Sequence, residues 1–125
     1  MKKEIRPEGA PASAKPYSPG VALDGWLYVS GQGPIDDATG KPVAGTIEEE
    51  TRLTLRHVAR ILEAAGCGFD DVVKCACHLS DIHDYDRFNA VYAEFFKGVR
   101  PARTTVQSVL WGGIKVEIDC VARKA

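Results

Sequence analysis

Alternating apolar and polar residues near the end of the chain predict two β-strands, at roughly residues 103–110 and 114–122. Side chains alternate across a strand, so Arg103 and Thr105 should share one face of the first strand. In the second strand alternate residues are apolar, and Glu117 belongs to the polar set. The pattern therefore predicts a sheet with one apolar and one polar face in this region.

Apolar residues recur at helical spacing in two other segments. The first should form a helix of roughly 47–65, because Thr46 and Glu49 make a capping-box pattern before the periodic residues. The second should form a helix of roughly 84–97, whose wide apolar stripe is rich in aromatic residues. Asn89 lies within this stripe, and surface exposure would be its usual explanation because asparagine is a poor interior helix residue.

Shorter apolar runs predict three more strands. The runs at 21–23 and 26–30 flank an Asp-Gly pair, which is the signal of a two-residue hairpin turn. The third run covers 72–79. Before the hairpin, residues 7–19 contain four prolines and should form an extended or looping arm that carries Tyr17.

The order of these elements favours a mixed sheet of α+β type. Strands and helices do not alternate one for one, as they would in a Rossmann-like sheet. Two helices can cover only one face of such a sheet, and the other face also carries valine and isoleucine. Oligomerisation is the expected way to bury that face.

Length and charge limit the functions that the chain can have. At 125 residues it should form one domain, covering residues 1–125. Its formal net charge of −1 argues against nucleic acid as a partner, because nucleic-acid binders normally carry a basic excess. No apolar run approaches the length of a membrane span, and the charged start of the chain is unlike a secretory signal.

The cysteines and histidines offer little support for a metal site. The four cysteines fit free thiols in a reducing cytosol, which predicts a cytoplasmic protein. Cys75 and Cys77 lie two residues apart, a spacing that differs from the common zinc motifs, so a site built from them and His78 is disfavoured. His57, on the first predicted helix, should be a surface or hydrogen-bonded histidine rather than a ligand.

Arg103 and Glu117 are the residues of the final strands that could carry chemistry. The planar guanidinium of an arginine can hold a carboxylate through two parallel hydrogen bonds. A glutamate between two apolar neighbours could transfer a proton. Together they would form a minimal active site, but an ordinary sheet with a surface salt bridge explains the same two residues.

Several segments, in a fixed order, resemble the Rid (reactive intermediate deaminase) family, also called the YjgF or L-PSP endoribonuclease-like family. They extend from about residue 7 to residue 122, and the ordered set is far more specific than any single piece. The main segments are Pro16-Tyr17-Ser18, Val29-Ser30-Gly31-Gln32-Gly33-Pro34-Ile35, Thr51-Arg52-Leu53-Thr54-Leu55, Phe88-Asn89-Ala90-Val91-Tyr92, Pro101-Ala102-Arg103-Thr104-Thr105-Val106 and Val116-Glu117-Ile118-Asp119.

The resemblance implies a chorismate-mutase-like α+β subunit that assembles as a homotrimer. The sheets would form an inner barrel with the helices outside, and three clefts would lie between neighbouring subunits. Family members that act on 2-aminoacrylate, 2-iminopropionate and related enamine or imine acids hydrolyse them to 2-keto acids and ammonia. The implied partner is thus a small imino or enamino acid, and no cofactor is implied.

The resemblance also implies roles for residues that match the family's motifs. Arg103 looks like the residue that pairs with the substrate carboxylate, and Glu117 resembles the acid placed near the attacking water. The positions that would line the cleft or bind substrate are Tyr17, Ser30, Gly31, Asn89 and Thr105.

Two residues depart from the family pattern. Thr105 stands where many well-studied deaminases have cysteine, and because threonine keeps a small polar group we interpret the change as a tuning of substrate preference. Trp111 stands where the family commonly has the proline of a Leu-Pro pair. The sequence leaves open whether its ring faces the cleft or covers the edge of the sheet.

Other functions are compatible with the same scaffold. One is a different enzyme, such as an aminomuconate-type deaminase or an endoribonuclease, although the near-neutral charge argues against RNA. Another is a non-catalytic, chaperone-like trimer that binds carboxylates. Glu117 argues against a pure binding role, since a second carboxylate near a bound acid would repel it.

Overall fold

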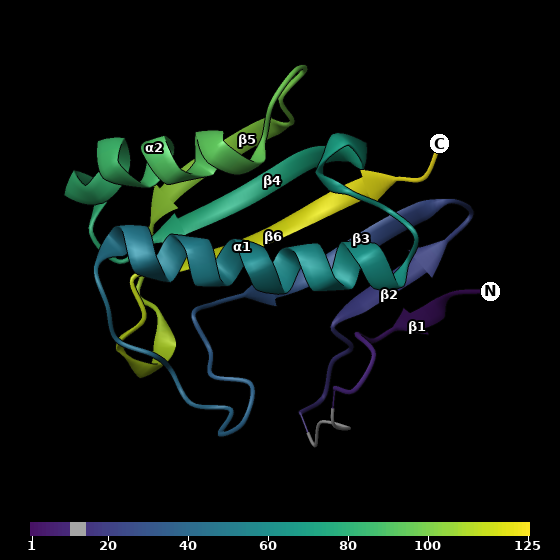
Figure 1. The fold of residues 1–125 in the computed structure, drawn as a ribbon, viewed down its shortest axis with the longest axis horizontal. Helices are drawn as coiled ribbons and strands as arrows, with labels where there is room; N and C mark the ends of the chain where they lie inside the picture. Colours follow the sequence, from purple (N-terminus) through teal and green to yellow (C-terminus); the bar gives the residue numbers. More distant parts are fainter. Residues whose placement is uncertain (11–14) are drawn as a thin grey trace.

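The structure is a computed structural model that describes residues 1–10 and 15–125, and over these ranges it shows a six-stranded sheet with two α-helices against one face (Figure 1). The helices are α1 (Ile47–Ala64) and α2 (Tyr85–Phe95). The strands are β1 (Lys3–Ile5), β2 (Gly20–Leu23), β3 (Trp26–Gln32), β4 (Val72–Leu79), β5 (Ala102–Gln107) and β6 (Val116–Arg123). Short 3₁₀ turns lie at η1 (Phe69–Asp71), η2 (Ile82–Asp84) and η3 (Trp111–Gly113). The α+β class is confirmed.

The last strand of the chain, β6, lies in the middle of the sheet, whose order is β1-β2-β3-β6-β4-β5. Neighbouring strands are antiparallel except β4 and β5, which are parallel and joined by a crossover through α2. The two strands predicted at the end of the chain are present, but β4 lies between them. The sequence pattern does not predict β1, because three residues are too few to show alternation.

Local signals account for both ends of α1. The Thr46 hydroxyl accepts a hydrogen bond from the Glu49 N–H at 3.1 Å, and the Glu49 carboxylate accepts one from the Thr46 N–H at 2.9 Å. Gly66 follows the helix with φ of +74°, a left-handed conformation that glycine adopts without strain. The capping box is thus confirmed, and the helix ends one residue before the predicted end.

The second helix is shorter than its apolar stripe predicts. The Asp81 carboxylate accepts a hydrogen bond from the His83 N–H at 2.9 Å and begins the 3₁₀ turn η2, so the α-helix itself starts at Tyr85. Phe96 leaves the helix with ψ of 106° yet keeps its ring in the core at 2% exposure. The stripe therefore continues beyond the helical segment.

The hydrophobic core lies between the helices and the sheet. Residues that face it, all at most 4% exposed, include Leu27, Val29, Cys75, Cys77, Val116, Ile118 and Cys120. The opposite, helix-free face of the sheet is open: Trp26, Tyr28 and Val106 there are 37% to 50% exposed. Large apolar side chains on an uncovered sheet face indicate a surface that a partner could bury.

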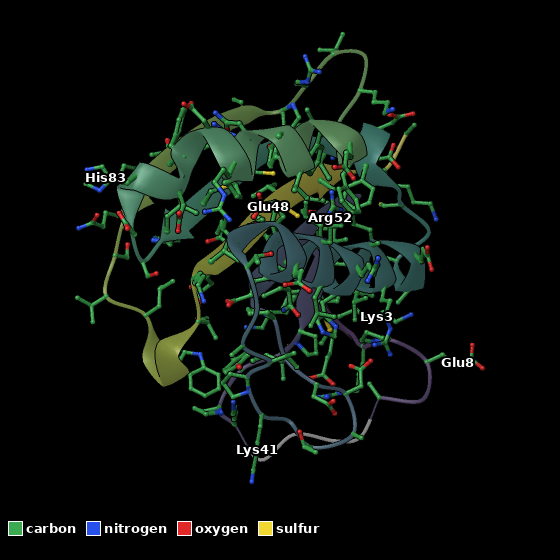
Figure 2. All side chains as sticks on the ribbon, turned by 60° about the vertical axis from the view of Figure 1, so that its left-hand side comes forward. Lys3, Glu8, Lys41, Glu48, Arg52 and His83 are labelled. Carbon is green, nitrogen blue, oxygen red and sulfur yellow. The ribbon has the colours of Figure 1, made fainter. Side chains whose placement is uncertain are left out.

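Polar side chains project from the edges of the molecule, as those of Glu8, Lys41 and His83 do in Figure 2. Among residues 1–10 and 15–125, no helix has the length and apolar character that a membrane crossing requires.

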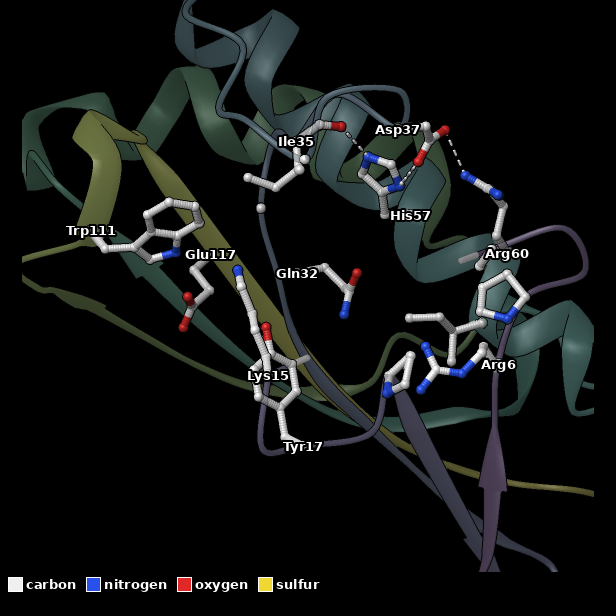
Figure 3. A pocket seen from close by; sticks show the side chains of 17 residues that line it. Arg6, Lys15, Tyr17, Gln32, Ile35, Asp37, His57, Arg60, Trp111 and Glu117 are labelled. Carbon is white, nitrogen blue, oxygen red and sulfur yellow. Dashed lines mark hydrogen bonds and ion pairs between the residues drawn. The ribbon is translucent and has the colours of Figure 1, made fainter. Parts of the chain in front are cut away.

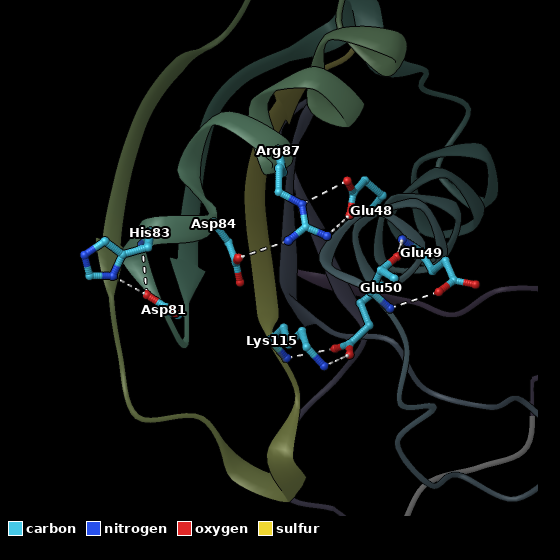
Figure 4. A network of polar contacts seen from close by, with 9 residues as sticks. Glu48, Glu49, Glu50, Asp81, His83, Asp84, Arg87 and Lys115 are labelled. Atoms are coloured by element: carbon cyan, nitrogen blue, oxygen red, sulfur yellow. Dashed lines mark hydrogen bonds and ion pairs between the residues drawn. The ribbon is translucent and has the colours of Figure 1, made fainter.

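A buried carboxylate, Glu50, connects α1 to the start of β6 (Figure 4). It is 2% exposed and accepts hydrogen bonds from the Lys115 N–H at 2.8 Å, the Lys115 ammonium at 3.0 Å and the Gly45 N–H at 3.1 Å. Lys115 lies two residues before Glu117, so this contact helps to place the polar residues of β6. The sequence shows Glu50 only as one of three consecutive glutamates.

Replacing Glu50 with alanine should lower the free energy of unfolding by about 2–3 kcal/mol, because two backbone N–H groups lose their acceptor in a part-buried site. Urea denaturation followed by circular dichroism would measure the change. Glu48→Ala is the matched control: Glu48 pairs with Arg87 at 2.8 Å, but the side chains are 33% and 54% exposed and the pair satisfies no buried backbone group, so little change is expected. Equal effects of the two substitutions would contradict the anchoring role of Glu50.

Candidate functional site

Arg103 lies on the helix-covered face of the edge strand β5. In the parallel β4–β5 pairing it is the partner of Cys75, which is fully buried beneath the helices. Its Nη2 donates a hydrogen bond to the Tyr85 hydroxyl at 3.1 Å, and its guanidinium lies against aromatic rings of α2. The arginine is therefore held at the rim between β5 and α2.

Asn89 and Thr105 present buried polar atoms in the same region. Thr105 follows Arg103 by two residues on the same face of β5, and its Oγ1 is buried without a hydrogen-bond partner among the described residues. Asn89 lies one turn after Tyr85 on α2, and its Oδ1 is likewise buried and unpaired. Surface exposure therefore does not explain Asn89. An unpaired buried polar atom costs about 1–3 kcal/mol, so both atoms have hydrogen-bonding capacity left for a ligand or a second chain.

We call Arg103, Asn89 and Thr105 the arginine half-site. Burial raises the pKa of the neighbouring Tyr92 hydroxyl well above its usual range and raises the pKa of the Cys77 thiol to about 12. Both groups therefore stay protonated at neutral pH and cannot act there as bases. The arginine half-site can bind an anion, but a base must come from elsewhere.

Glu117 lies on the opposite face of the sheet. It is the antiparallel partner of His78 on β4, one residue away from the buried pair of Cys77 and Ile118. Its carboxyl lines a cavity of about 330 Å³, which is open at the surface and is also lined by Tyr17, Gly31 and Trp111 (Figure 3). We call Glu117, Tyr17, Gly31 and Trp111 the glutamate half-site.

The backbone at Gly31 allows the carboxyl of Glu117 to lie close to β3. A Cβ at position 31 would be 2.9 Å from both Cδ and Oε2 of Glu117, closer than real Cβ contacts come. The β3–β6 pairing also shifts between Val29 and Gln32, which marks a bulge at this point. Because Gly31 has no side chain, the carboxyl of Glu117 can lie directly against β3.

Ser30 holds the arm that carries Tyr17 against β3 and so helps to place the glutamate half-site. Its hydroxyl donates a hydrogen bond to the Ser18 carbonyl at 2.6 Å, and its N–H donates to the Pro19 carbonyl at 2.9 Å. These bonds attach the arm that carries Tyr17 to β3. Ser30 itself is not among the residues that line the cavity.

Trp111 faces the cavity rather than only the edge of the sheet. It begins the turn η3, and the ammonium of Lys15 lies 4.9 Å from the centre of its ring, near Glu117 in Figure 3. Gly112 follows with φ of +65°, and a Cβ there would be 2.8 Å from the Pro42 ring. Turn η3 therefore packs against the loop before α1 and presents Trp111 to the cavity. The sequence gives no signal that the ammonium of Lys15 lies over the Trp111 ring.

The far end of the cavity carries a hydrogen-bonded histidine. His57 Nε2 lies 2.7 Å from the Ile35 carbonyl and must donate to it, while Nδ1 lies 3.7 Å from the Asp37 carboxylate. Arg60 donates to the same carboxylate at 2.7 Å. His57 is thus satisfied by its neighbours, as predicted.

The two half-sites do not meet within one chain. Cys75 pairs with Arg103 on one side and with Cys120 on the other, so these three residues share the helix-covered face. Glu117 lies three positions from Cys120 and therefore faces the other way. A salt bridge between Arg103 and Glu117 is thus excluded within one chain, and so is a minimal active site built from both in a single subunit.

The same alternation separates the candidate metal ligands. Cys75 and Cys77 face the helices, whereas His78 faces the helix-free side and lies 2.8 Å from the Ser108 hydroxyl. Over residues 1–10 and 15–125, no group of three or more histidine, cysteine or acidic side chains is arranged to hold a metal ion.

Comparison with known proteins gives consistent matches over the whole chain. The family model described as Endoribonuclease L-PSP matches residues 7–124. A RutC family protein of Saccharolobus solfataricus is 44% identical, with 100% of both chains covered. A 2-iminobutanoate/2-iminopropanoate deaminase of Bos taurus is 41% identical, with 98% of this chain and 90% of the relative covered. A solved structure of a conserved Rid family protein from Yersinia pestis has a TM-score of 0.92 at 38% identity, covering 98% of this chain and 99% of that one.

These matches define the chain first as a small α+β protein of the L-PSP endoribonuclease class. Within that class, it belongs to the Rid family, also called the YjgF family. The resemblance of its sequence segments to this family is therefore confirmed.

Proposed function

We propose that the protein hydrolyses reactive imino and enamino acids, of the 2-iminopropionate and 2-aminoacrylate type, to 2-keto acids and ammonia. Mammalian relatives about 40% identical to this chain carry the name 2-iminobutanoate/2-iminopropanoate deaminase. The observation that carries the proposal is the open cavity that the partly exposed Glu117 lines beside Gly31. At about 330 Å³ it has room for a small imino acid and a water molecule, which occupies about 30 Å³.

The proposed active site lies between subunits of a homotrimer. One subunit contributes the arginine half-site, and its neighbour contributes the glutamate half-site. Three features support this assembly: Arg103 and Glu117 face opposite sides of the sheet, Asn89 and Thr105 have unpaired buried atoms, and the helix-free face is apolar. Contact between the half-sites would also cover part of that apolar face.

The proposed reaction uses water and two side chains. Arg103 binds the substrate carboxylate and so fixes the position of the adjacent imine carbon. Glu117 accepts a proton from a water molecule as the water oxygen bonds to that carbon, and it passes this proton to the imine nitrogen, which gives a neutral carbinolamine. Glu117 then takes the proton of the carbinolamine hydroxyl and delivers it to the nitrogen as the carbon–nitrogen bond breaks, so the nitrogen leaves as ammonia and the hydroxyl oxygen becomes the keto group.

A coupled assay tests the proposal directly. Threonine dehydratase or an amino-acid oxidase generates the imino acid, and the rate of 2-keto acid release is followed with and without the protein. We expect acceleration over spontaneous hydrolysis, and comparison of several amino acids would rank the substrates. Unchanged keto-acid release, with either RNA cleavage or carboxylate binding alone, would instead support one of the alternative functions.

Gly31→Ala should impair hydrolysis without unfolding the protein. The added methyl group would displace the carboxyl of Glu117, which is the end of a flexible side chain and can move at little cost in stability. Displacement of a catalytic group by about 1 Å can reduce the rate of the chemical step roughly a hundredfold. We therefore expect kcat of Gly31→Ala to fall about ten- to a hundredfold.

Gly68→Ala is the matched control for Gly31→Ala, because a Cβ at Gly68 meets nothing within 4 Å. The coupled assay and thermal unfolding would be measured for both variants. Normal kcat in Gly31→Ala would refute the close placement of Glu117 against β3 as a requirement for activity.

A further inference from the structure

Three aromatic rings on one face of α2 surround the guanidinium of Arg103. Its Cζ lies 4.7 Å from the ring centre of Tyr92, 5.5 Å from that of Phe88 and 5.6 Å from that of Tyr85. The three residues are spaced three and four apart, which brings them to the same side of the helix. Aromatic rings within about 6 Å attract a guanidinium, so the rings restrict where it can lie.

Tyr85 differs from the other two rings in its contact with Arg103. Phe88 and Tyr92 are 0% and 5% exposed and belong to the core, whereas Tyr85 is 39% exposed and forms the outer rim. The Tyr85 hydroxyl accepts a hydrogen bond from Arg103 Nη2 at 3.1 Å. Phe88 has no hydroxyl, and the Tyr92 hydroxyl receives no hydrogen bond from Arg103. Tyr85 is therefore the ring that can fix the rotation of the guanidinium as well as its location.

We infer that Tyr85 is a positioning residue, which orients Arg103 so that the open edge of its guanidinium faces the substrate carboxylate. This inference rests on the proposed function. An arginine binds a carboxylate best through two parallel N–H groups, and a side chain already held in that orientation loses less freedom on binding. One N–H of Nη2 is used for Tyr85, and the guanidinium retains donors for a ligand.

The test is Tyr85→Phe, which keeps the ring and removes the hydroxyl. Because Tyr85 acts on carboxylate binding and not on water attack, KM in the coupled assay should rise about fivefold, as for the loss of one hydrogen bond, while kcat stays within about twofold. The Kd for 2-oxobutanoate, a 2-keto acid product, should rise by the same factor in isothermal titration calorimetry. Tyr85→Leu also removes the ring and should raise both constants further.

Tyr28→Phe serves as the matched control, because Tyr28 is 50% exposed on the helix-free face and belongs to neither half-site. Unchanged KM and Kd in Tyr85→Phe would overturn the inference and leave the proposed function intact. A lower kcat and a lower unfolding midpoint at constant KM would also overturn it, since they indicate a purely structural role.

The inference and the proposed function can fail separately. If the wild-type protein binds 2-oxobutanoate but hydrolyses no imine, the proposed function fails and the Kd comparison still decides the role of Tyr85. If the wild-type protein neither hydrolyses imines nor binds 2-oxobutanoate, both are overturned.

Discussion

Arg103→Ala should eliminate measurable imine hydrolysis while leaving the proposed oligomer intact. The substitution removes the only group of the arginine half-site that carries a charge able to bind the substrate carboxylate, and loss of such a charged contact typically costs about 2–5 kcal/mol. We therefore expect kcat/KM to fall on the order of a hundredfold or more. Arg103 contacts the core rings of Phe88 and Tyr92 only from the partly exposed rim of an edge strand, so its truncation should leave the fold in place.

The coupled assay measures the activity of this variant, and light scattering after size exclusion measures its mass. Arg103→Lys should also be severely impaired, because an ammonium cannot form two parallel hydrogen bonds to a carboxylate. Arg56→Ala, at an exposed position of α1, is the control for loss of one positive charge. Hydrolysis retained by Arg103→Ala would refute the assignment of the carboxylate site.

Helices and strands that have local sequence signals could be predicted from the sequence, whereas the order in which the strands pair in the sheet could not. The capping box fixes the start of α1, and alternation correctly predicts that Arg103 and Thr105 share a face of β5. Nothing in β5 or β6 indicates that β4 lies between them, because a parallel crossover is decided by how α2 packs on the sheet. The relation between Arg103 and Glu117 depends on this insertion. The pattern of the two strands by itself favours a surface salt bridge, which the register excludes, whereas the resemblance to the Rid family implies a cleft between subunits.

Individual residues were hard to predict where tertiary contacts determine their environment. Glu50 and Glu48 are two residues apart in one acidic run, yet only Glu50 points into the structure and binds the backbone of Lys115. Asn89 would ordinarily be exposed, but its Oδ1 is buried. Tyr85 contributes to an aromatic stripe in the sequence, and its hydroxyl contact to Arg103 depends on β5 being the neighbouring strand. In each case the missing information is which surface packs against the residue.

Glu117→Gln should reduce kcat by about 10²- to 10⁴-fold, which is the range expected when a general base is lost. Glutamine has nearly the same shape, so the cavity and the unfolding midpoint should change little. Binding of 2-oxobutanoate should be retained, because in the proposed mechanism Arg103, and not Glu117, holds the carboxylate. Loss of binding together with loss of rate would contradict a role confined to proton transfer, and a normal kcat would exclude Glu117 as the base.

Mixing the two inactive variants tests whether the site is shared between subunits. Arg103→Ala chains have an intact glutamate half-site, and Glu117→Gln chains have an intact arginine half-site. If each active site takes one half-site from each of two neighbours, random co-assembly makes one pairing in four fully competent, so roughly a quarter of wild-type activity should return. The two variants would be unfolded and refolded together, with each refolded alone as a control. A site built within one chain would be damaged in every subunit of the mixture, so its activity would not exceed the sum of the two controls. That result would refute the shared site.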